Sequence, residues 1–274
     1  MVSAKDIVVK PITAQAANAL VRRVHYSGKV VQNSQLHLGV FLYGRLEGVM
    51  QFGPSLDKRR MQGLVSGTSW NGFIELNRMA FSEALPRNSE SRALSVAFRM
   101  IRKTYPHIEW IVSFSDGAQC GDGTIYRASG FVLTSIKKNN SIWKAPSGES
   151  FSRTALTDGQ SKRQQQQAKQ IVSGTTVTKG GHAAKAGGGA SMKIYKNAGW
   201  EPISGFQIRY VYFLNTAARE RLTVPVMPFS KIDEMGAGMY KGKFKRMKQA
   251  NSGDQPESGG AAPTHALQSL QDAT

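Results

Sequence analysis

The sequence predicts an α/β fold, with one compact unit over residues 6–143. Segments with the apolar pattern of strands alternate here with segments whose apolar residues recur at helical spacing. Two of the strand-like segments are separated by a short glycine-containing turn, as in a β-hairpin. The 274 residues are 40% hydrophobic and 9% aromatic, which is typical of a globular protein with a sizeable core.

The first half of this unit is expected to hold a strand, a helix and a hairpin. Residues 6–10 (DIVVK) predict a short strand, and the apolar spacing over 11–24 predicts a helix. LHLGVFLYG at 36–44 and LEGVMQFG at 46–53 predict a hairpin with its turn at Gly44. The basic stretch from 55 to 71 is either a loop or a broken helix.

The second half is expected to continue with a strand over 72–81 and a helix capped by Asn88 or Ser89 and ended by Pro106. The apolar run over 108–116 predicts a strand in the sheet interior. After it come a short helix ending at Gly130, a strand beginning at Val132 and a late strand in FQIRYVYFL. The expected buried face of the long helix consists of Leu94, Val96, Ala97, Met100 and Ile101.

Composition divides the chain further. Residues 145–190 contain QQQQ and GGHAAKAGGGA with little apolar periodicity, which predicts a flexible insertion. We expect a core over 1–144, completed by a C-terminal strand within 191–243, and a basic run with a disordered tail over 244–274.

The net charge of +18 favours a polyanionic partner, because neutralising phosphates releases counterions. A ribosomal or structural protein would share this charge, and a single basic cluster is usually a solvated face. No helix-turn-helix, zinc-finger or RNA-recognition signature is evident, so short-context recognition is expected. The expected phosphate contacts are Lys58, Arg59, Arg60, Lys137, Lys138, Lys241, Lys243, Lys245, Arg246 and Lys248.

The sequence also predicts a cytoplasmic location. The one cysteine, Cys120, excludes an internal disulfide, which suits a reducing compartment. No apolar run approaches the roughly 18 residues of a membrane-spanning helix, and the first residues lack the apolar core of a signal peptide.

The order of hairpin, strand, polar loop, helix, strand, short helix and strand resembles the GNAT acyltransferase fold. This resemblance implies a central mixed, mostly antiparallel sheet flanked by helices. It also implies that a loop at a helix N-terminus receives the pyrophosphate of coenzyme A. Here that loop reads PRNSESR rather than a glycine-rich string. The residues available to an acyl-CoA or a related donor are Arg87, Asn88, Ser89 and Arg92.

Two stretches, IYRASGF at 125–131 and IYKNAGW at 194–200, nearly repeat each other. Tyr126 follows the apolar strand that ends at Asp116, where proteins of the GNAT fold commonly place a general-acid tyrosine. We therefore predict chemistry for Tyr126 and a packing role for Tyr195. The alternative for Tyr126 is a half-buried aromatic residue.

The strings HYSGK, ELNRMAF, PRNSESRALS, SFSDG and GDGTIYRASGF, with GAGMYKG near the C-terminus, resemble the phage Mom family of DNA adenine-modifying proteins. The resemblance covers roughly residues 20–140 well and weakens toward residue 243. It implies conversion of adenine in DNA to N6-carbamoylmethyladenine, which shields phage DNA from host restriction. The partner would be double-stranded DNA in the host cytoplasm, with the target base flipped out of the helix.

The resemblance places Tyr26, Arg78, Ser91, Asp116 and Tyr126 at the family's active-site positions. Tyr26 would stack on the base, Asp116 would orient or deprotonate its amine, and Tyr126 would exchange a proton. Arg78 would hold the donor or a phosphate, and Ser91 would donate a hydrogen bond near the helix start. Each has a plainer alternative, such as an ion pair, a helix-start hydroxyl or a turn residue.

The iron requirement proposed for this family makes His25, Tyr26 and Asp116 candidate metal ligands, although their spacing is not diagnostic. Two other functions remain open on the sequence. One is an acyl-CoA-dependent N-acyltransferase acting on a protein or small amine. The other is a non-catalytic basic DNA-binding protein on a GNAT scaffold.

Overall fold

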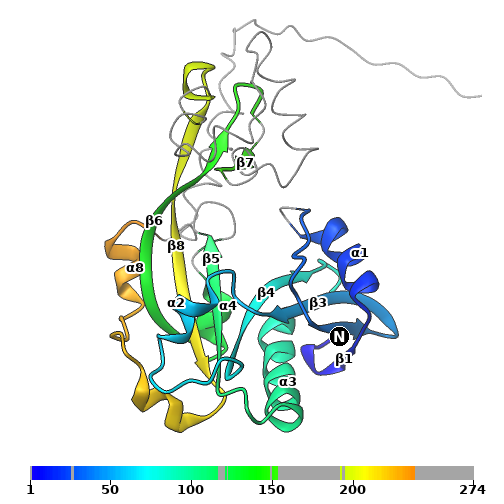
Figure 1. The fold of residues 1–274 in the computed structure, drawn as a ribbon. Helices are drawn as coiled ribbons and strands as arrows, with labels where there is room; N and C mark the ends of the chain where they lie inside the picture. Colours follow the sequence, from blue (N-terminus) through cyan, green and yellow to red (C-terminus); the bar gives the residue numbers. More distant parts are fainter. Residues whose placement is uncertain are drawn as a thin grey trace, which may run out of the picture. The chain divides into compact units, whose positions relative to one another are not determined.

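The computed structural model describes residues 2–25, 28–116, 121, 123–148, 150–153, 192 and 195–237 (Figure 1). All of them belong to a compact unit spanning Met1–Tyr240. The second unit, Lys241–Thr274, lies outside the described residues.

The described residues form an eight-stranded sheet in the order β1-β2-β3-β4-β5-β8-β6-β7. Only β4 and β5 run parallel, and every other neighbouring pair is antiparallel. This arrangement confirms the expected α/β fold with a mixed, mostly antiparallel sheet. The strands are β1 Ile7–Pro11, β2 Leu36–Leu42, β3 Arg45–Gly53, β4 Phe73–Phe81, β5 Trp110–Asp116, β6 Val132–Lys144, β7 Ser150–Ser152 and β8 Glu201–Phe213.

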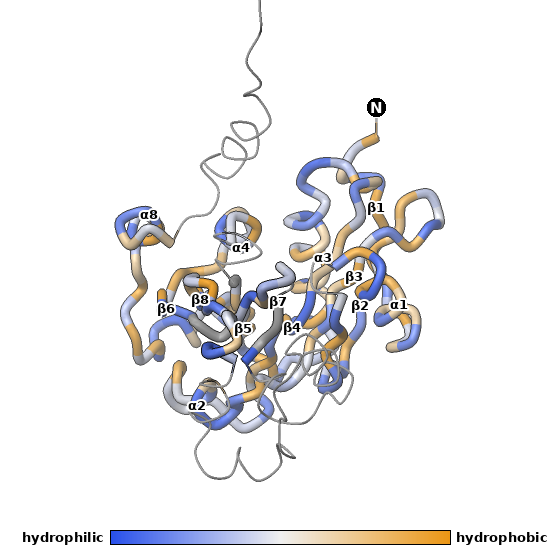
Figure 2. The backbone as a smooth tube through the Cα atoms, turned by 90° about the horizontal axis from the view of Figure 1, so that it is seen from above, coloured by the Kyte–Doolittle hydropathy of each residue, from blue (hydrophilic) through white to orange (hydrophobic). Residues whose placement is uncertain are grey.

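Helices cover both faces of this sheet (Figure 2). The long helix α3 lies on one face with α4 and α8, and α1 and α2 lie on the other. No helix in the described part of the chain is long and apolar enough to cross a bilayer. The helices are η1 Ala4–Asp6, α1 Ala14–Val24, α2 Lys58–Gln62, α3 Ser89–Thr104, α4 Thr124–Ala128, η2 Thr216–Arg221 and α8 Ser230–Glu234.

The core lies mainly between the sheet and α3. Leu94 and Ile101 of α3 are buried there, as expected, but Val96 and Met100 are only half-buried. Ala93 and Phe98 are buried instead, because the face of α3 that meets the sheet follows the 3.6-residue period from Leu94. The buried face of the helix is therefore slightly rotated from the expected one.

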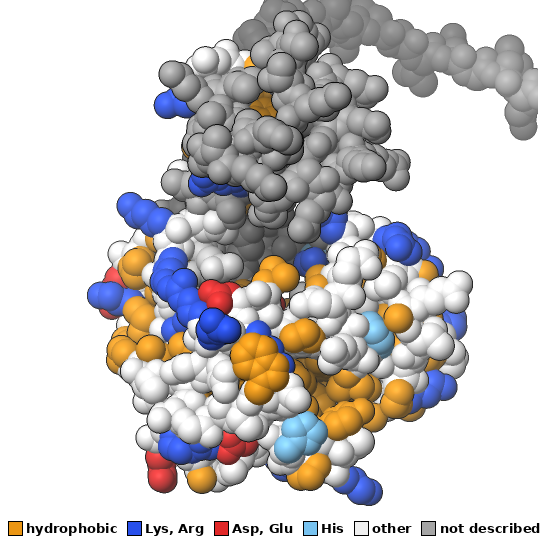
Figure 3. All heavy atoms as spheres, in the orientation of Figure 1, with side chains coloured by type: hydrophobic (Ala, Val, Ile, Leu, Met, Phe, Trp, Pro, Cys, Tyr) orange, Lys and Arg blue, Asp and Glu red, His pale blue; other side chains and the backbone are white. Residues whose placement is uncertain are grey.

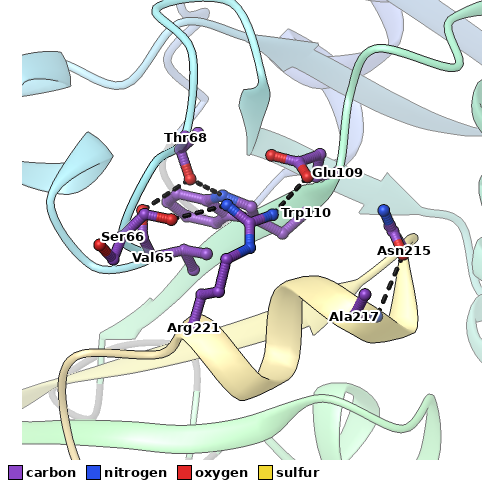
Figure 4. A network of polar contacts seen from close by, with 8 residues as sticks. All are labelled: Val65, Ser66, Thr68, Glu109, Trp110, Asn215, Ala217 and Arg221. Carbon is purple, nitrogen blue, oxygen red and sulfur yellow. Dashed lines mark hydrogen bonds and ion pairs between the residues drawn. The ribbon is translucent and has the colours of Figure 1, made fainter.

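A polar network joins the chain near η2 to the edge of β5 (Figure 4). Arg221 forms an ion pair with Glu109 and donates a second hydrogen bond to the Ser66 carbonyl at 2.6 Å. Close by, the indole N–H of Trp110 donates to Thr68 Oγ1 at 3.0 Å, which satisfies the polar atom of a fully buried ring. These contacts fix the segment between α2 and β4.

The repeated stretches form the same local structure. The Tyr126 and Phe131 rings meet edge to face at 5.2 Å, and the Tyr195 and Trp200 rings do so at 5.0 Å. In each copy the backbone N–H of the second aromatic residue donates back to the tyrosine carbonyl. The intervening glycine has a left-handed φ, +83° at Gly130 and +80° in the second copy. Each of the two repeated stretches is therefore a turn that ends a helix and is closed by a pair of aromatic rings.

The strands β4 and β5 separate soon after they pair. Their parallel ladder covers three residue pairs, from Phe73 opposite Trp110 to Glu75 opposite Val112. Beyond that, the Ser113 hydroxyl donates to the Leu76 carbonyl at 3.3 Å in place of a ladder bond. The two strands then diverge (Figure 1).

Candidate active site

A β-bulge shapes the β4 side of the opening. The register between β3 and β4 shifts between Gln51 and Phe52, which leaves Asn77 as an extra residue on β4. The Asn77 side-chain oxygen accepts a hydrogen bond from Ser34 Oγ at 3.2 Å. In the same loop, the Asn33 amide donates to the Pro54 carbonyl at 2.7 Å. The bulge thus holds the loop that follows α1 against the end of β3.

Next to the bulge, Arg78 meets the C-terminal end of α1. Its Nη1 lies 3.5 Å from Nε2 of His25, the residue that ends the helix. Burial, and then the charge of Arg78, lower the pKa of His25 from 6.5 to about 4. The imidazole is therefore neutral at pH 7, with Nε2 facing a permanent cation.

Two more ionisable groups share this environment. The pKa of Lys29 is lowered, first by burial and then by the charge of Arg78. The pKa of Glu75 is raised by burial, although hydrogen bonds from Ser55 and Asn77 and the charge of Arg78 oppose the rise. The half-buried carboxyl group of Glu75 and the amine of Lys29 therefore both respond to the charge of Arg78.

Beside Glu75, a hollow of about 310 Å³ opens between α2 and the strands β5, β6 and β8. Phe114 lines it, together with Gln207 of β8 and Lys137 of β6. Arg60 of α2 and Arg209 of β8 line it as well. Figure 3 shows Lys and Arg side chains gathered over α2 and β6 on this face.

The cations of this hollow form no ion pair with the acids whose side chains the structure describes. Arg209 is held by Thr134, with its Nε donating to Thr134 Oγ1 at 3.0 Å and Nη2 donating to the Thr134 carbonyl at 3.2 Å. Burial, and then the charge of Arg60, lower the pKa of Arg209. Among the described residues, no carboxylate pairs with Arg60, Lys137 or Arg209. An anionic ligand would relieve this repulsion.

Tyr126 lies on the opposite face of the sheet from Arg78. Its ring is half-buried and packs against Phe131 and, at 5.1 Å between centroids, against Tyr210. These rings belong to the core cluster beneath α3. Arg78 and Tyr126 therefore flank the diverging strands from two sides.

The other expected catalytic residues are only partly described. Asp116 ends β5, where its backbone is paired opposite Gln207 of β8. Its side chain and the whole of Tyr26 lie outside the described residues. Ser91 is half-buried in the first turn of α3, and its hydroxyl donates to the Asn88 carbonyl at 3.1 Å.

The loop expected to receive the donor leads into α3. Arg87 and Arg92 are exposed on either side of the helix start. Asn88 has a left-handed φ of +68°, and its side chain does not cap the helix. Ser89 is fully buried, with its hydroxyl donating to the Pro86 carbonyl at 2.7 Å. Arg87, Asn88 and Arg92 are thus accessible polar residues of this loop and helix start, and Ser89 stabilises the loop itself.

The residues around His25 do not fit a cation in this structure. Nε2 of His25, the unprotonated nitrogen that a metal ion would need, faces the Arg78 guanidinium instead. Among the described residues, no group of three His, Cys, Asp or Glu side chains is placed to hold a metal ion. Of the other expected ligands, Tyr26 and the Asp116 side chain are not described.

The expected phosphate contacts divide between different surfaces. Arg60 and Lys137 line the 310 Å³ hollow, whereas Lys58 borders another of about 480 Å³. Lys58 donates to the Asn71 side chain at 2.9 Å, and its ammonium lies 4.6 Å from the centre of the exposed Trp70 ring. Arg59 and Lys138 are exposed. The run Lys241, Lys243, Lys245, Arg246 and Lys248 lies outside the described residues.

Sequence reasoning missed Arg209, because FQIRYVYFL was interpreted only as a core strand. The signal was present, since a cation inside an apolar strand must either reach solvent or meet a partner. Gln207 follows the same alternation, so both residues point away from the face of buried Ile208 and Tyr210.

Solved structures of acetyltransferases resemble parts of this chain. One is an acetyltransferase assigned to the GNAT family from Desulfovibrio desulfuricans, with a TM-score of 0.37 and 11% identity, covering 76% of this chain and 99% of that one. Another is a GNAT family acetyltransferase from Elizabethkingia anophelis with acetyl-CoA bound, with a TM-score of 0.35 and 15% identity, covering 49% of this chain and 81% of that one.

The sequence comparisons reach further along the chain. A curated relative, the methylcarbamoylase Mom of Escherichia phage Mu, is 34% identical over 232 residues, which cover 83% of this chain and 85% of the relative. Residues 6–231, which include β4 with its bulge and both arginines of the hollow, match the Mom protein family. The chain belongs to the Mom protein family.

Proposed function

We propose that this protein is a transferase that converts adenine in double-stranded DNA to N6-carbamoylmethyladenine. The observation that carries the proposal is the 34% identity to a methylcarbamoylase over 83% of this chain. The net charge of +18 supports a phosphate-rich substrate. For a phage-encoded protein, the modified DNA would escape host restriction.

The reaction is a group transfer to the exocyclic amine of adenine. A bond forms between the amine nitrogen and the methylene carbon of the carbamoylmethyl group. The bond from that carbon to the leaving atom of the donor breaks, and the amine loses one proton. The donor is a molecule that carries a carbamoylmethyl group on such a leaving atom, and the proton passes to a base on the protein.

Asp116 is our candidate for this base, because it ends β5 beside the opening between β4 and β5. Arg78 would hold the donor or a phosphate, with neutral His25 accepting from its guanidinium and fixing its direction. Tyr126 would supply a proton to the leaving group from the other face. Tyr26 would stack on the base, and Ser91 would donate a hydrogen bond at the start of α3.

The donor would approach the start of α3. If it is an acyl-CoA or a related molecule, Arg87 and Arg92 are the exposed cations that would hold its phosphates. Phosphates also favour the first turn of a helix, where peptide N–H groups have no partner within the helix. When bound, a donor that carries the carbamoylmethyl group on its leaving atom through the methylene carbon would supply the group to be transferred and a stable leaving group.

Mass analysis of nucleosides tests the proposal. DNA from cells expressing the protein is expected to contain a deoxyadenosine in which a carbamoylmethyl group replaces one hydrogen. Acetylated amines without any new nucleoside would instead favour an acyltransferase with another substrate. If neither product formed while DNA binding persisted, the protein would be a binding protein only.

An Asp116→Ala variant tests the assigned base. It is expected to abolish the new nucleoside while leaving the affinity for duplex DNA within about twofold, because the carboxylate is assigned to proton transfer rather than to phosphate binding. Glu220→Ala, which removes an exposed carboxylate in η2, is the matched control and should change neither. Loss of both modification and DNA binding in Asp116→Ala would make this residue structural.

A further inference from the structure

The 310 Å³ hollow lies next to the position assigned to the catalytic base. Gln207, which lines it, is the backbone partner of Asp116 across β5 and β8. Glu75, on its β4 side, is three residues from Arg78, whose charge acts to lower the pKa of the Glu75 carboxyl group. A molecule in the hollow would therefore lie within reach of the end of β5.

The walls of the hollow match the chemistry of an adenine base. Phe114 offers a half-buried aromatic ring for stacking. A glutamine amide such as that of Gln207 can donate to and accept from adenine at once, which is the usual pairing of this side chain with adenine. Glu75 adds a carboxyl group to the lining, and a carboxylate oxygen can accept a hydrogen bond from an exocyclic amine. The volume lies at the small end of the roughly 300–1,000 Å³ typical of ligand sites.

The rim of the hollow matches the chemistry of the nucleotide backbone. Arg60, Lys137 and Arg209 approach it from three different elements and make no ion pair among the described residues. Asp57, also at the rim, accepts a hydrogen bond from the Arg60 backbone N–H at 3.3 Å and so caps α2. Phosphate groups on either side of a nucleotide would satisfy these cations.

A leucine stands at the lip of the hollow with almost its whole side chain in water. Leu56 is 94% exposed, the highest exposure among the large hydrophobic residues described. Its neighbours are well held, because Ser55 is 6% exposed and Asp57 caps α2. Proteins that bend DNA frequently insert an apolar side chain such as leucine between base steps.

We propose that this hollow receives an adenine nucleotide extruded from duplex DNA, and that Leu56 enters the base stack in its place. The proposal rests on the proposed function and identifies the site that selects the base. Phe114 stacks on the adenine, Gln207 hydrogen-bonds to it, and the rim cations hold the flanking phosphates. Leu56 lowers the cost of extrusion without touching the reacting amine.

Base extrusion is measured with 2-aminopurine, whose fluorescence rises when it leaves the stack. The probe replaces one adenine in a set of duplexes covering every combination of flanking bases, and the full-length protein is added to saturation. At least one duplex is expected to brighten with the wild-type protein. In Leu56→Ala the extruded fraction should fall about tenfold, because the apolar side chain that replaces stacking has been removed.

Two further variants separate insertion from a general change of the surface. Leu56→Met keeps a large apolar side chain and should restore most of the brightening. Val8→Ala shortens another exposed apolar side chain, on β1, and should leave the signal unchanged. Equal brightening by wild type and Leu56→Ala, or no brightening in any duplex, would overturn the proposal.

The cationic rim is tested through binding affinity. Lys137→Glu reverses an exposed charge at the hollow, whereas Lys103→Glu makes the same change on α3, on the other face of the sheet. Lys137→Glu is expected to weaken duplex binding about tenfold more than Lys103→Glu, since attraction to a phosphate becomes repulsion. If the two variants bound duplex DNA with equal affinity, DNA phosphates would not be held at this hollow.

Failure of the site and failure of the reaction give different results. If the fluorescence rise depended on Leu56 but cellular DNA contained no new nucleoside, the extrusion site would be supported and the proposed adenine modification contradicted. A new nucleoside formed equally well by wild type and Leu56→Ala, without brightening, would retain the reaction and reject the site.

Discussion

At the residue scale, the contact between His25 and Arg78 explains how a guanidinium is held at the bulge of β4. The imidazole closes α1 and accepts from Nη1 of Arg78, so helix end and strand bulge fix one another. A protonated imidazole could not accept this hydrogen bond and would repel the guanidinium. The neutral state of His25 is therefore required by its position.

This arrangement predicts how stability changes with pH. The pKa of His25 in the folded protein is about 4, below its ordinary value of 6.5, so the unfolded chain binds more protons between these values. The contribution of His25 to the free energy of unfolding is present above pH 6.5 and is lost as pH falls toward 4. Glu75, whose pKa is raised, changes the stability with pH in the opposite sense. It is present in both the wild type and a His25→Gln variant, so its effect cancels when the two are compared.

Urea unfolding of wild type and His25→Gln at successive pH values between 7 and 4 measures this contribution. The free energy of unfolding should decline more steeply in the wild type across that window. Parallel curves would mean that His25 titrates alike in the folded and unfolded states.

At the scale of elements, α3 stabilises the sheet through one narrow face. Leu94 and Phe98 lie a helical turn apart and are buried against the sheet, whereas Ser95 between them is exposed. The start of this helix also carries the loop assigned to the donor. Packing of α3 therefore sets both the stability of the fold and the position of Arg87 and Arg92.

Leu94→Ala should destabilise the protein by about 2–5 kcal/mol, because it removes a fully buried side chain and leaves a cavity. Ser95→Ala, one residue along the same helix, should change the stability by less than about 0.5 kcal/mol. Chemical denaturation of both variants checks this contrast. Similar effects in the two would mean that α3 packs in another rotation.

At the scale of the whole molecule, part of the excess positive charge lies around a hollow on the sheet and another part in a basic run near the C-terminus. The hollow supplies a local site for a nucleotide. The run Lys241–Lys248 lies outside the described residues, so its contact with DNA stays a prediction.

Replacing Lys241, Lys243, Lys245, Arg246 and Lys248 by Ala tests this prediction. The slope of log affinity against log salt should become shallower by up to about 0.9 for each phosphate that the protein no longer neutralises. Titrations at several salt concentrations measure the slope, with Arg99→Ala plus Lys103→Ala on α3 as a control that should leave it unchanged. A slope equal to that of the wild type would exclude the run from the DNA surface.

Much of this fold is predictable from sequence because its elements depend on local patterns. The hairpin, the strand over 108–116 and the helix from Ser89 appear close to their expected positions, since apolar periodicity and turn residues act over a few neighbours. The same local patterns missed the short strand β7, which pairs with the end of β6. A three-residue strand carries too few residues to show a period.

The expected active site was predictable only as a set of residues from the family resemblance. Its geometry depends on strand register, which the sequence does not display. The bulge at Asn77 turns Arg78 toward α1, and Tyr126 packs on the other face beneath α3. Arg60 and Arg209 lie far apart in the chain, yet they line one hollow because β8 crosses back beside β5.

The family, most of the strands and helices in their order, and the excess of positive charge follow from residue identity and local spacing, so they are predictable without a structure. The three-dimensional structure was needed to show that two arginines and a lysine line one hollow with an exposed leucine, and that Gln207 lies opposite Asp116. Such placements arise from long-range strand pairing, where a shift of one residue sends every side chain to the other face.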